Sequence, residues 1–165
     1  MTINLQESPQ QIVVSIDGRS VAFSNHASKK FSFVQIRACV QFFEELETNI
    51  KIVLFIPAWI DDKDFREEME SRTELHKVTG INGHPSRDDK YALGETVLTA
   101  GFIVSNDKKM HEHSNNPLVD RAWIASRRVG FRFGKGPVFI PGFPERWHKV
   151  CAELRTPRDG NEEVI

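Results

Sequence analysis

The sequence lacks the features of several protein classes. Its 165 residues include only two cysteines, Cys39 and Cys151, and no CxxC motif, so neither a disulfide framework nor a cysteine zinc site is expected. The longest apolar run, 52–56, is too short to cross a bilayer, and residues 1–11 lack the charged-then-apolar pattern of a signal peptide. We therefore expect no membrane partner and a cytoplasmic location, with the nucleus left open.

A strong net charge is also missing. The chain carries a net charge of -1 and has a pI near 6.6, so any attraction to nucleic acid must come from local clusters of basic residues. Such clusters occur at 127–128 with Arg132 and Lys135, at 29–30 and at 108–109. Each cluster, taken alone, is equally typical of a solvated surface. No glycine-rich phosphate loop follows the first apolar run, which argues against a nucleotide-binding or phosphatase-like protein.

What is present suits one globular domain. Hydrophobic residues make up 39% of the chain, and twelve phenylalanines against one tyrosine predict a phenylalanine-rich core. We expect a polar leader at 1–11, a single domain at 12–150 and a polar C-terminal tail at 151–165, frayed from about residue 155. Cys39 and Cys151 are predicted to be packed thiols.

Short apolar runs alternate with helical patterns. Strands are predicted at 12–16, 51–57, 102–105, 129–133 and 137–140, and helices at 32–47, 61–76, 88–100 and 118–128. Phe65, Met69 and Leu75 form the apolar side of the helix at 61–76. The turn-rich segment 77–87 is predicted to be a loop, with room for a very short strand at its start. This alternation is typical of an α/β protein with a parallel sheet.

Acidic residues stand where the predicted strands end. Asp17 closes the first strand, Asp107 follows the strand at 102–105, and Asp88 and Asp89 open a helix. In open α/β sheets ligands bind outside the carboxyl ends of the strands, and carboxylates gathered there ionise together only if a cation compensates them. Oxygen ligands favour magnesium or manganese over zinc. Any single aspartate is better explained as a helix cap or a turn residue, so the prediction depends on the whole set.

Four segments together resemble a known family. Residues 14–22 (VSIDGRSVA), 55–59 (FIPAW), 88–89 (DD) and 104–107 (VSND) are similar, in order and spacing, to the Regnase-type NYN ribonuclease domain, a branch of the PIN-like nucleases. The resemblance runs from about residue 12 to residue 144. It implies a PIN-like three-layer α/β/α sandwich with a mainly parallel central sheet, a magnesium-dependent acidic site, and endonucleolytic cutting of single-stranded or loop RNA.

Carried over residue by residue, the resemblance implies that Asp17, Asp89 and Asp107 hold the metal ion, with Asp88 as a further catalytic carboxylate. Two positions depart from the family pattern. Ser20 lies in the segment where the family usually has an asparagine, and His111 stands where the family has another aspartate. A histidine cannot supply the negative charge that magnesium prefers, although Glu112 is adjacent. The run 111–113 (HEH) is better explained as a surface loop than as a metal site of its own.

Two functions therefore stay open. In the first, the chain is an endoribonuclease in which magnesium, or manganese in its place, activates water for attack on a phosphodiester. Asn106, Ser20 and His111 are then supporting residues, and the residues expected to contact RNA are Arg127, Arg128, Lys108 and Arg132. Trp59 or Phe131 would offer a stacking face if they are not in the core.

In the second, His111 and Ser20 mark a degenerate domain that serves as an RNA-binding or protein-interaction subunit. The 165 residues contain no CCCH zinc finger of the kind that often follows this domain in the family. RNA targeting is therefore expected to need another module or a partner protein, and pairing of the domain with itself is a further alternative.

Overall fold

The computed structural model describes residues 11–24, 30–46, 48–79 and 88–155. A six-stranded sheet with the order β3-β2-β1-β4-β5-β6 forms its centre. The strands are β1 (Ile12–Asp17), β2 (Ile50–Pro57), β3 (Glu74–Val78), β4 (Phe102–Val104), β5 (Arg128–Gly134) and β6 (Val138–Gly142). The helices are α1 (Gly18–Ala22), α2 (Phe33–Glu44), α3 (Lys63–Arg72), α4 (Asp88–Thr99), α5 (Arg121–Arg127) and α6 (Glu145–Arg155), with a 3-10 turn η1 (Met110–His113).

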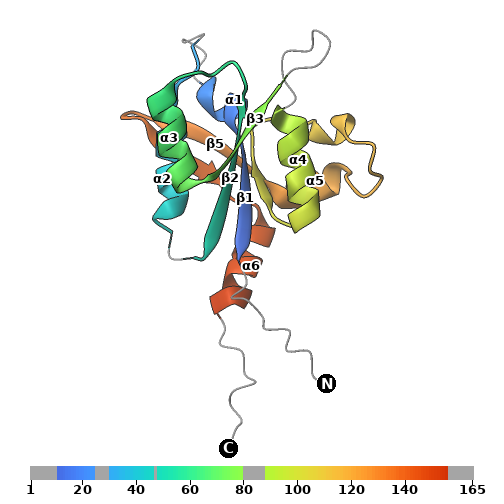
Figure 1. Cartoon of the computed structure of the whole chain (residues 1–165). Helices are drawn as coiled ribbons and strands as arrows, with labels where there is room; N and C mark the ends of the chain where they lie inside the picture. Colours follow the sequence, from blue (N-terminus) through green and yellow to red (C-terminus); the bar gives the residue numbers. More distant parts are fainter. Residues whose placement is uncertain (1–10, 25–29, 47, 80–87, 156–165) are drawn as a thin grey trace, which may run out of the picture.

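The first five strands are parallel, and β6 returns antiparallel to β5. Helices α2 and α3 cover one face of the sheet, and α4 and α5 cover the other (Figure 1). The predicted three-layer α/β/α sandwich with a mainly parallel sheet is confirmed. Within the described ranges, no helix is long and apolar enough to cross a membrane.

Side chains alternate along β1 between two hydrophobic clusters. Val14 and Ile16 join the larger cluster on the side of α2, whereas Val13 packs against the smaller one on the side of α4. Asp17 follows the same alternation as Val13, so its side chain lies on the face of the sheet that α4 covers. The alternation of the strand thus decides which helix can share a site with Asp17.

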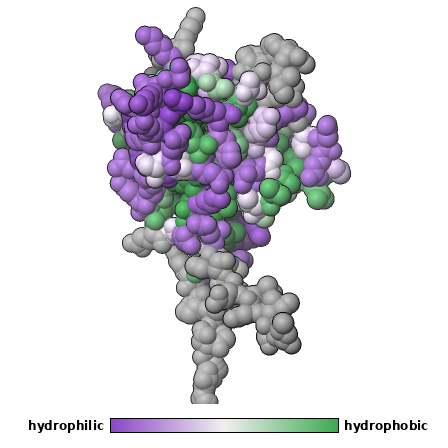
Figure 2. All heavy atoms as spheres, in the orientation of Figure 1, coloured by the Kyte–Doolittle hydropathy of each residue, from purple (hydrophilic) through white to green (hydrophobic). Residues whose placement is uncertain are grey.

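The predicted phenylalanine-rich core is confirmed. Phe43 is 1% exposed and meets Phe139 at a ring-centroid distance of 5.8 Å and Trp147 at 6.1 Å. Cys39 and Cys151 are both buried free thiols, as predicted. Hydrophilic side chains gather over α3, so the apolar residues of that helix face inward (Figure 2).

The predicted helix at 61–76 is wrong in its last four residues, 73–76. Helix α3 ends at Arg72, Thr73 is extended, and β3 then pairs in parallel with β2, with Leu75 opposite Leu54. Leu75 therefore packs from a strand and not from a helix. β3 is an edge strand, and its residues other than Leu75 and Val78 are polar and exposed. Two apolar residues are too few to reveal the alternation by which a strand is recognised in a sequence.

Three further elements differ from the prediction. The short helix α1 was not predicted. The helix expected at 118–128 begins at Arg121, because the Asp120 carboxylate caps it by accepting from the backbone N–H of Trp123 at 2.8 Å. Helix α6 runs through the expected start of the polar tail at 151, and its Trp147 and Cys151 are buried against the core. Residues 156–165 lie outside the described part.

Candidate active site

Asp17 is held at the junction of β1 and α1. Its backbone is extended, its Oδ1 accepts from the backbone N–H of Ser20 at 3.3 Å, and its Oδ2 accepts from the hydroxyl of Ser105 at 3.0 Å. The side chain caps α1 and is only 5% exposed. One carboxylate thus ends the strand, starts the helix and faces the turn that follows β4.

Gly18 allows this junction to form. A Cβ atom at this position would lie 2.2 Å from the carbonyl oxygen of Phe55 in β2, far inside van der Waals contact. Only a glycine lets the start of α1 lie so close to the β2 backbone. The glycine that follows the strand aspartate therefore has a packing role that fixes where Asp17 points.

The turn after β4 is fixed by three polar contacts. Asn106 donates from its backbone N–H to the Ser20 hydroxyl at 2.9 Å, and Asp107 donates from its backbone N–H to the Ser105 hydroxyl at 3.1 Å. The Asn106 amide pairs with the backbone of Phe131 in both directions, at 3.0 and 2.9 Å. Asn106 thus joins the turn to β5, and Ser20, predicted as a supporting residue, joins it to α1.

Three of the predicted carboxylates line one cleft. The cleft lies at the carboxyl end of the sheet, where α1 and α4 both begin (Figure 1), and measures about 280 Å³. Its lining residues are Asp17, Arg19, Ser20, Phe23, Asp89 and Asp107. Asp107 is also oriented by the backbone N–H of Lys109, which donates to its Oδ1 at 2.8 Å. The fourth predicted carboxylate, Asp88, begins α4, but its side chain lies outside the described part.

The negative charges of the cleft favour the binding of a cation. Burial, followed by the negative charge of Asp89 and more weakly that of Asp107, raises the pKa of Asp17 to about 6, against the lowering effect of its hydrogen bonds to Ser20 and Ser105. Burial and the neighbouring negative charges thus both disfavour the ionised form of Asp17. An all-oxygen donor set of this charge fits a hard divalent cation.

The three carboxylates line the cleft without converging on one point. In the described ranges, no group of three or more acidic, histidine or cysteine side chains stands close enough to hold a metal ion. Cation binding by all three therefore requires a closer approach of their carboxylates than this structure has.

His111 lies outside this cleft. Its Nε2 is 3.5 Å from the Nε of Arg121, and its Nδ1 is buried without a hydrogen-bond partner among the described atoms. Glu112 is exposed and does not line the cleft either. The position where the resemblance implies another aspartate thus contributes no carboxylate here, and the side chain of His113 lies outside the described part.

Two of the arginines predicted to contact RNA, Arg127 and Arg128, have their guanidinium groups at opposite ends of β4. Arg128 reaches the site, because its Nη1 donates to the carbonyl oxygen of Ser105 at 3.0 Å. Burial lowers the pKa of Arg128, and the nearby Asp107 carboxylate acts in the opposite direction. Arg127 instead donates to the carbonyl oxygen of Ala100 at 2.7 Å, before the amino end of β4. Arg127 is thus directed away from the carboxylates.

A larger groove of about 700 Å³ lies beside the turn after β4. Asn106 forms one part of its wall, and the β5–β6 hairpin forms the other with Phe131, Arg132, Phe133 and Lys135. Phe131 is buried, whereas Trp59 is 57% exposed, so of the two predicted stacking residues only Trp59 presents its ring to solvent. Lys108 is exposed next to Asp107.

Sequence reasoning missed Ser105 and Arg19 as site residues, and it placed Lys135 in a basic cluster without assigning it to the site. A weak signal existed for Ser105, a small polar residue that ends an apolar run directly before Asn106 and Asp107. No local signal placed Arg19 at the cleft or Lys135 at the larger groove, because those places depend on α1 and on the β5–β6 hairpin.

Comparison with known proteins identifies the family and the fold. The model of the Zc3h12a-like Ribonuclease NYN domain matches residues 10–153. A solved structure, nuclear proteinaceous RNase P 2 (PRORP2) from A. thaliana, is similar with a TM-score of 0.62 and 20% sequence identity, over 79% of this chain and 29% of that one. This chain thus spans less than a third of that protein, and the likeness concerns the fold. The resemblance to Regnase-type domains is confirmed: the chain belongs to the Zc3h12a-like ribonuclease NYN domain family.

Proposed function

We propose that this domain is a metal-dependent endoribonuclease that cuts single-stranded or loop RNA. The observation that carries the proposal is the shared cleft of Asp17, Asp89 and Asp107 at the carboxyl end of the sheet. Membership of a ribonuclease family supports a nuclease, and the carboxylates of the cleft are the kind of oxygen ligands that a metal ion for phosphodiester hydrolysis would need.

Magnesium, or manganese in its place, is the cation that these donors favour. Asp17, Asp89 and Asp107 would hold it, with Asp88 in support. The chemistry that such an ion supplies when bound is neutralisation of phosphate charge and a lowered pKa of water. Ser20 and Ser105 keep the Asp17 carboxylate pointed into the cleft, and Asn106 keeps the turn that carries Asp107 in place.

Basic residues around the cleft would carry the RNA backbone. Arg128 interacts electrostatically with Asp107, Lys108 is exposed beside Asp107, and Arg132 and Lys135 line the adjoining groove. Arg127 is left out of the proposed path, because its guanidinium lies at the opposite end of β4. We expect the RNA to pass from the groove over Asn106 to the carboxylates.

One observation favours the second candidate, a degenerate RNA-binding subunit. His111 replaces a carboxylate of the family pattern and does not line the cleft. Loss of one negative ligand weakens the hold on a divalent cation. Both candidate functions predict that the domain binds RNA, but only the endoribonuclease is expected to cleave it.

Incubation of the purified chain with single-stranded and stem-loop RNA, with magnesium or manganese, separates the candidates. We expect cleavage that leaves 5′-phosphate ends and that Asp17→Asn abolishes. Asp61→Asn is the matched control, because the Asp61 side chain is 90% exposed and lies outside the cleft, and it should cut like the wild type. RNA binding without cleavage would support the degenerate subunit, and neither binding nor cleavage would contradict both candidates.

A further inference from the structure

A second pocket lies at the same end of the sheet as the carboxylates. Asp17, Phe55 and His76 are register partners on the adjacent strands β1, β2 and β3. Neighbouring strands are about 4.8 Å apart, so His76 stands roughly 10 Å from Asp17 across the sheet. Helix α4 connects the two places, since Asp89 lines the carboxylate cleft and Tyr91 lines this pocket.

The pocket measures about 260 Å³ and has an aromatic wall. Its lining residues are Phe55, His76, Lys77, Val78, Thr79 and Tyr91. The His76 ring stacks on the Phe55 ring, with centroids 5.1 Å apart and planes 16° apart, and its Nε2 lies 2.8 Å from Oε2 of Glu74. The imidazole is thus held in one orientation by a buried ring and a carboxylate.

Its exposure sets this aromatic group apart from the core. Phe55 is only 4% exposed, whereas the His76 side chain is 46% exposed and Tyr91 is 49% exposed. Two rings with accessible faces at one pocket offer a surface on which a flat ring can stack. Lys77 adds a positive charge at the rim, and Thr79 and Tyr91 add hydroxyl groups.

We propose that this pocket receives one nucleobase of the RNA whose backbone lies at the carboxylate cleft. Single-stranded RNA is recognised by stacking of splayed bases on histidine and tyrosine rings, with basic side chains on the flanking phosphates. The volume is below the roughly 300–1,000 Å³ of sites for drug-sized ligands, which suits a single flat base. The inference rests on the proposed function and adds a place where the substrate strand is fixed.

Abasic scanning tests the pocket. Binding of the protein to a short fluorescent single-stranded RNA is measured by fluorescence anisotropy, with a chelator present so that no metal-dependent cleavage occurs. The measurement is repeated with a series of RNAs in which a single abasic nucleotide stands at a different position in each. We expect one position near the cut site, or adjacent ones, at which loss of the base weakens wild-type binding about tenfold. Tyr91→Ala and His76→Ala should bind the intact RNA about tenfold more weakly and lose the sensitivity to the abasic nucleotide.

The controls keep the test specific. Tyr91→Phe retains the ring and should retain the abasic effect, and Leu118→Ala, at an exposed residue outside the pocket, should behave as the wild type. If wild type and Tyr91→Ala respond equally to every abasic position while RNA is still bound and cut with metal, the pocket is not a base site and the proposed function stands. If the wild type neither binds nor cuts RNA, both proposals fail together.

Discussion

At the scale of the residue, Asp17 links stability to pH. Because its pKa is raised, the folded protein binds this proton more tightly than the unfolded chain does. The carboxyl group therefore stabilises the fold most below about pH 4, and this contribution is lost as the pH rises through the folded-state pKa of about 6.

We predict that Asp17→Asn gains stability relative to the wild type as the pH rises. Without divalent ions, the difference in unfolding free energy should shift in favour of the variant by about 3 kcal/mol between roughly pH 4 and pH 7, because the amide carries no charge. Denaturant titration of both proteins over this range measures the shift. A difference that stays constant with pH would contradict the buried, repelled carboxylate.

The carboxylates were predictable from the sequence, but the hydrogen bonds that orient them were not. Asp17 and Asp107 each follow an apolar run, which predicts their place at strand ends, whereas their shared cleft was predicted only from the whole set of carboxylates and the family resemblance. The contact from Ser105 to Asp17 joins residues 88 positions apart, and the contact from Asn106 to Ser20 joins residues 86 positions apart. Serine and asparagine suit so many turns that nothing local singles out these partners.

At the scale of the element, α1 depends on its glycine. Gly18→Ala places a methyl group against the Phe55 carbonyl oxygen, so that α1 must shift and carry Asp17 with it. We expect a loss of about 1–3 kcal/mol in stability and a loss of cleavage. Gly94→Ala is the matched control, because a Cβ there meets nothing within 4 Å, and it should gain about 0.5–1 kcal/mol as a helix former. Thermal melts and a cleavage assay compare the two.

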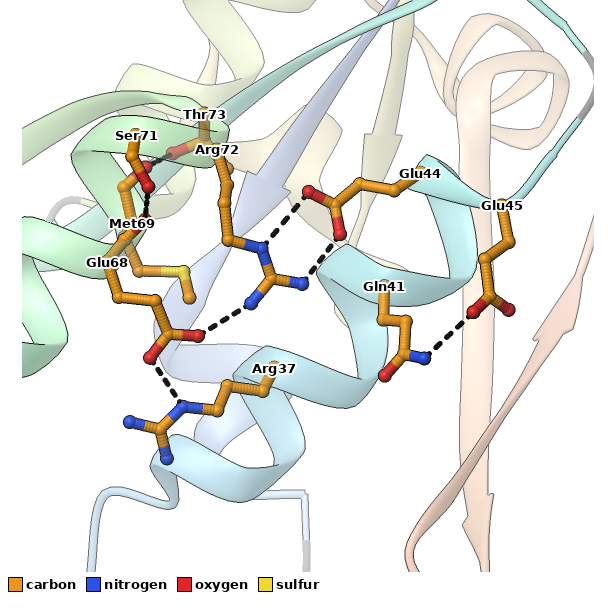
Figure 3. Close-up of polar contacts among 9 residues, drawn as sticks. All are labelled: Arg37, Gln41, Glu44, Glu45, Glu68, Met69, Ser71, Arg72 and Thr73. Carbon is orange, nitrogen blue, oxygen red and sulfur yellow. Dashed lines mark hydrogen bonds and ion pairs between the residues drawn. The ribbon is translucent and has the colours of Figure 1, made fainter.

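A chain of ion pairs joins α2 to α3 (Figure 3). Arg72 donates to Glu68 at 2.6 Å and to Glu44 at 2.6 and 3.0 Å, and Glu68 also accepts from Arg37 at 2.7 Å. Arg72 is the central member and its side chain is only 24% exposed. The network fixes the two helices on one face of the sheet and lies away from the carboxylate cleft.

We predict that Arg72→Met lowers the unfolding free energy by about 1–2 kcal/mol, because charge-assisted and forked hydrogen bonds to two carboxylates are lost. Lys63→Met is the control. Its partner Glu67 is 3.8 Å away and its side chain is 77% exposed, so the loss should stay below about 0.5 kcal/mol. Urea unfolding measures both variants, and equal losses would show that the network adds nothing to an ordinary surface pair.

Element prediction failed where tertiary contacts decided the structure. The charged stretch around α3 is helical by its own pattern, but Thr73 and the pairing of β3 with β2 end that helix early. Helix α1 has five residues, too short for a periodic pattern to reveal it. The strands of the sheet centre were found because both of their faces are buried, which leaves continuous apolar runs in the sequence.

At the scale of the whole molecule, a divalent cation should act as a stabilising ligand. Magnesium at about a hundredfold excess over its Kd should raise the melting temperature by roughly 5–10 °C near neutral pH. The rise should vanish in Asp17→Asn and in the wild type with a chelator. Sodium chloride at matched ionic strength is the control for screening, and an equal rise with sodium would contradict a specific site. Differential scanning fluorimetry suffices for the measurement.

The fold class could be predicted from the sequence because it depends on a repeated pattern of apolar runs and helical segments. The larger groove and the aromatic pocket on either side of the carboxylate cleft could not be predicted in this way. Their walls come from opposite ends of the sheet order, with β3 on one side and the β5–β6 hairpin on the other. Only the assembled sheet brings His76 and Arg132 to either side of the same site.

The two outer strands of the sheet have a consequence for self-assembly. Glu74, His76 and Lys77 of β3 are exposed, and β6 includes Pro141, which has no N–H to offer a neighbour. Charges and proline at the rims of a sheet discourage the addition of a strand from another copy. The polar groups that we assign to base recognition thereby also protect the protein against amyloid-like stacking, so replacing them with apolar β-branched residues would create an aggregation hazard.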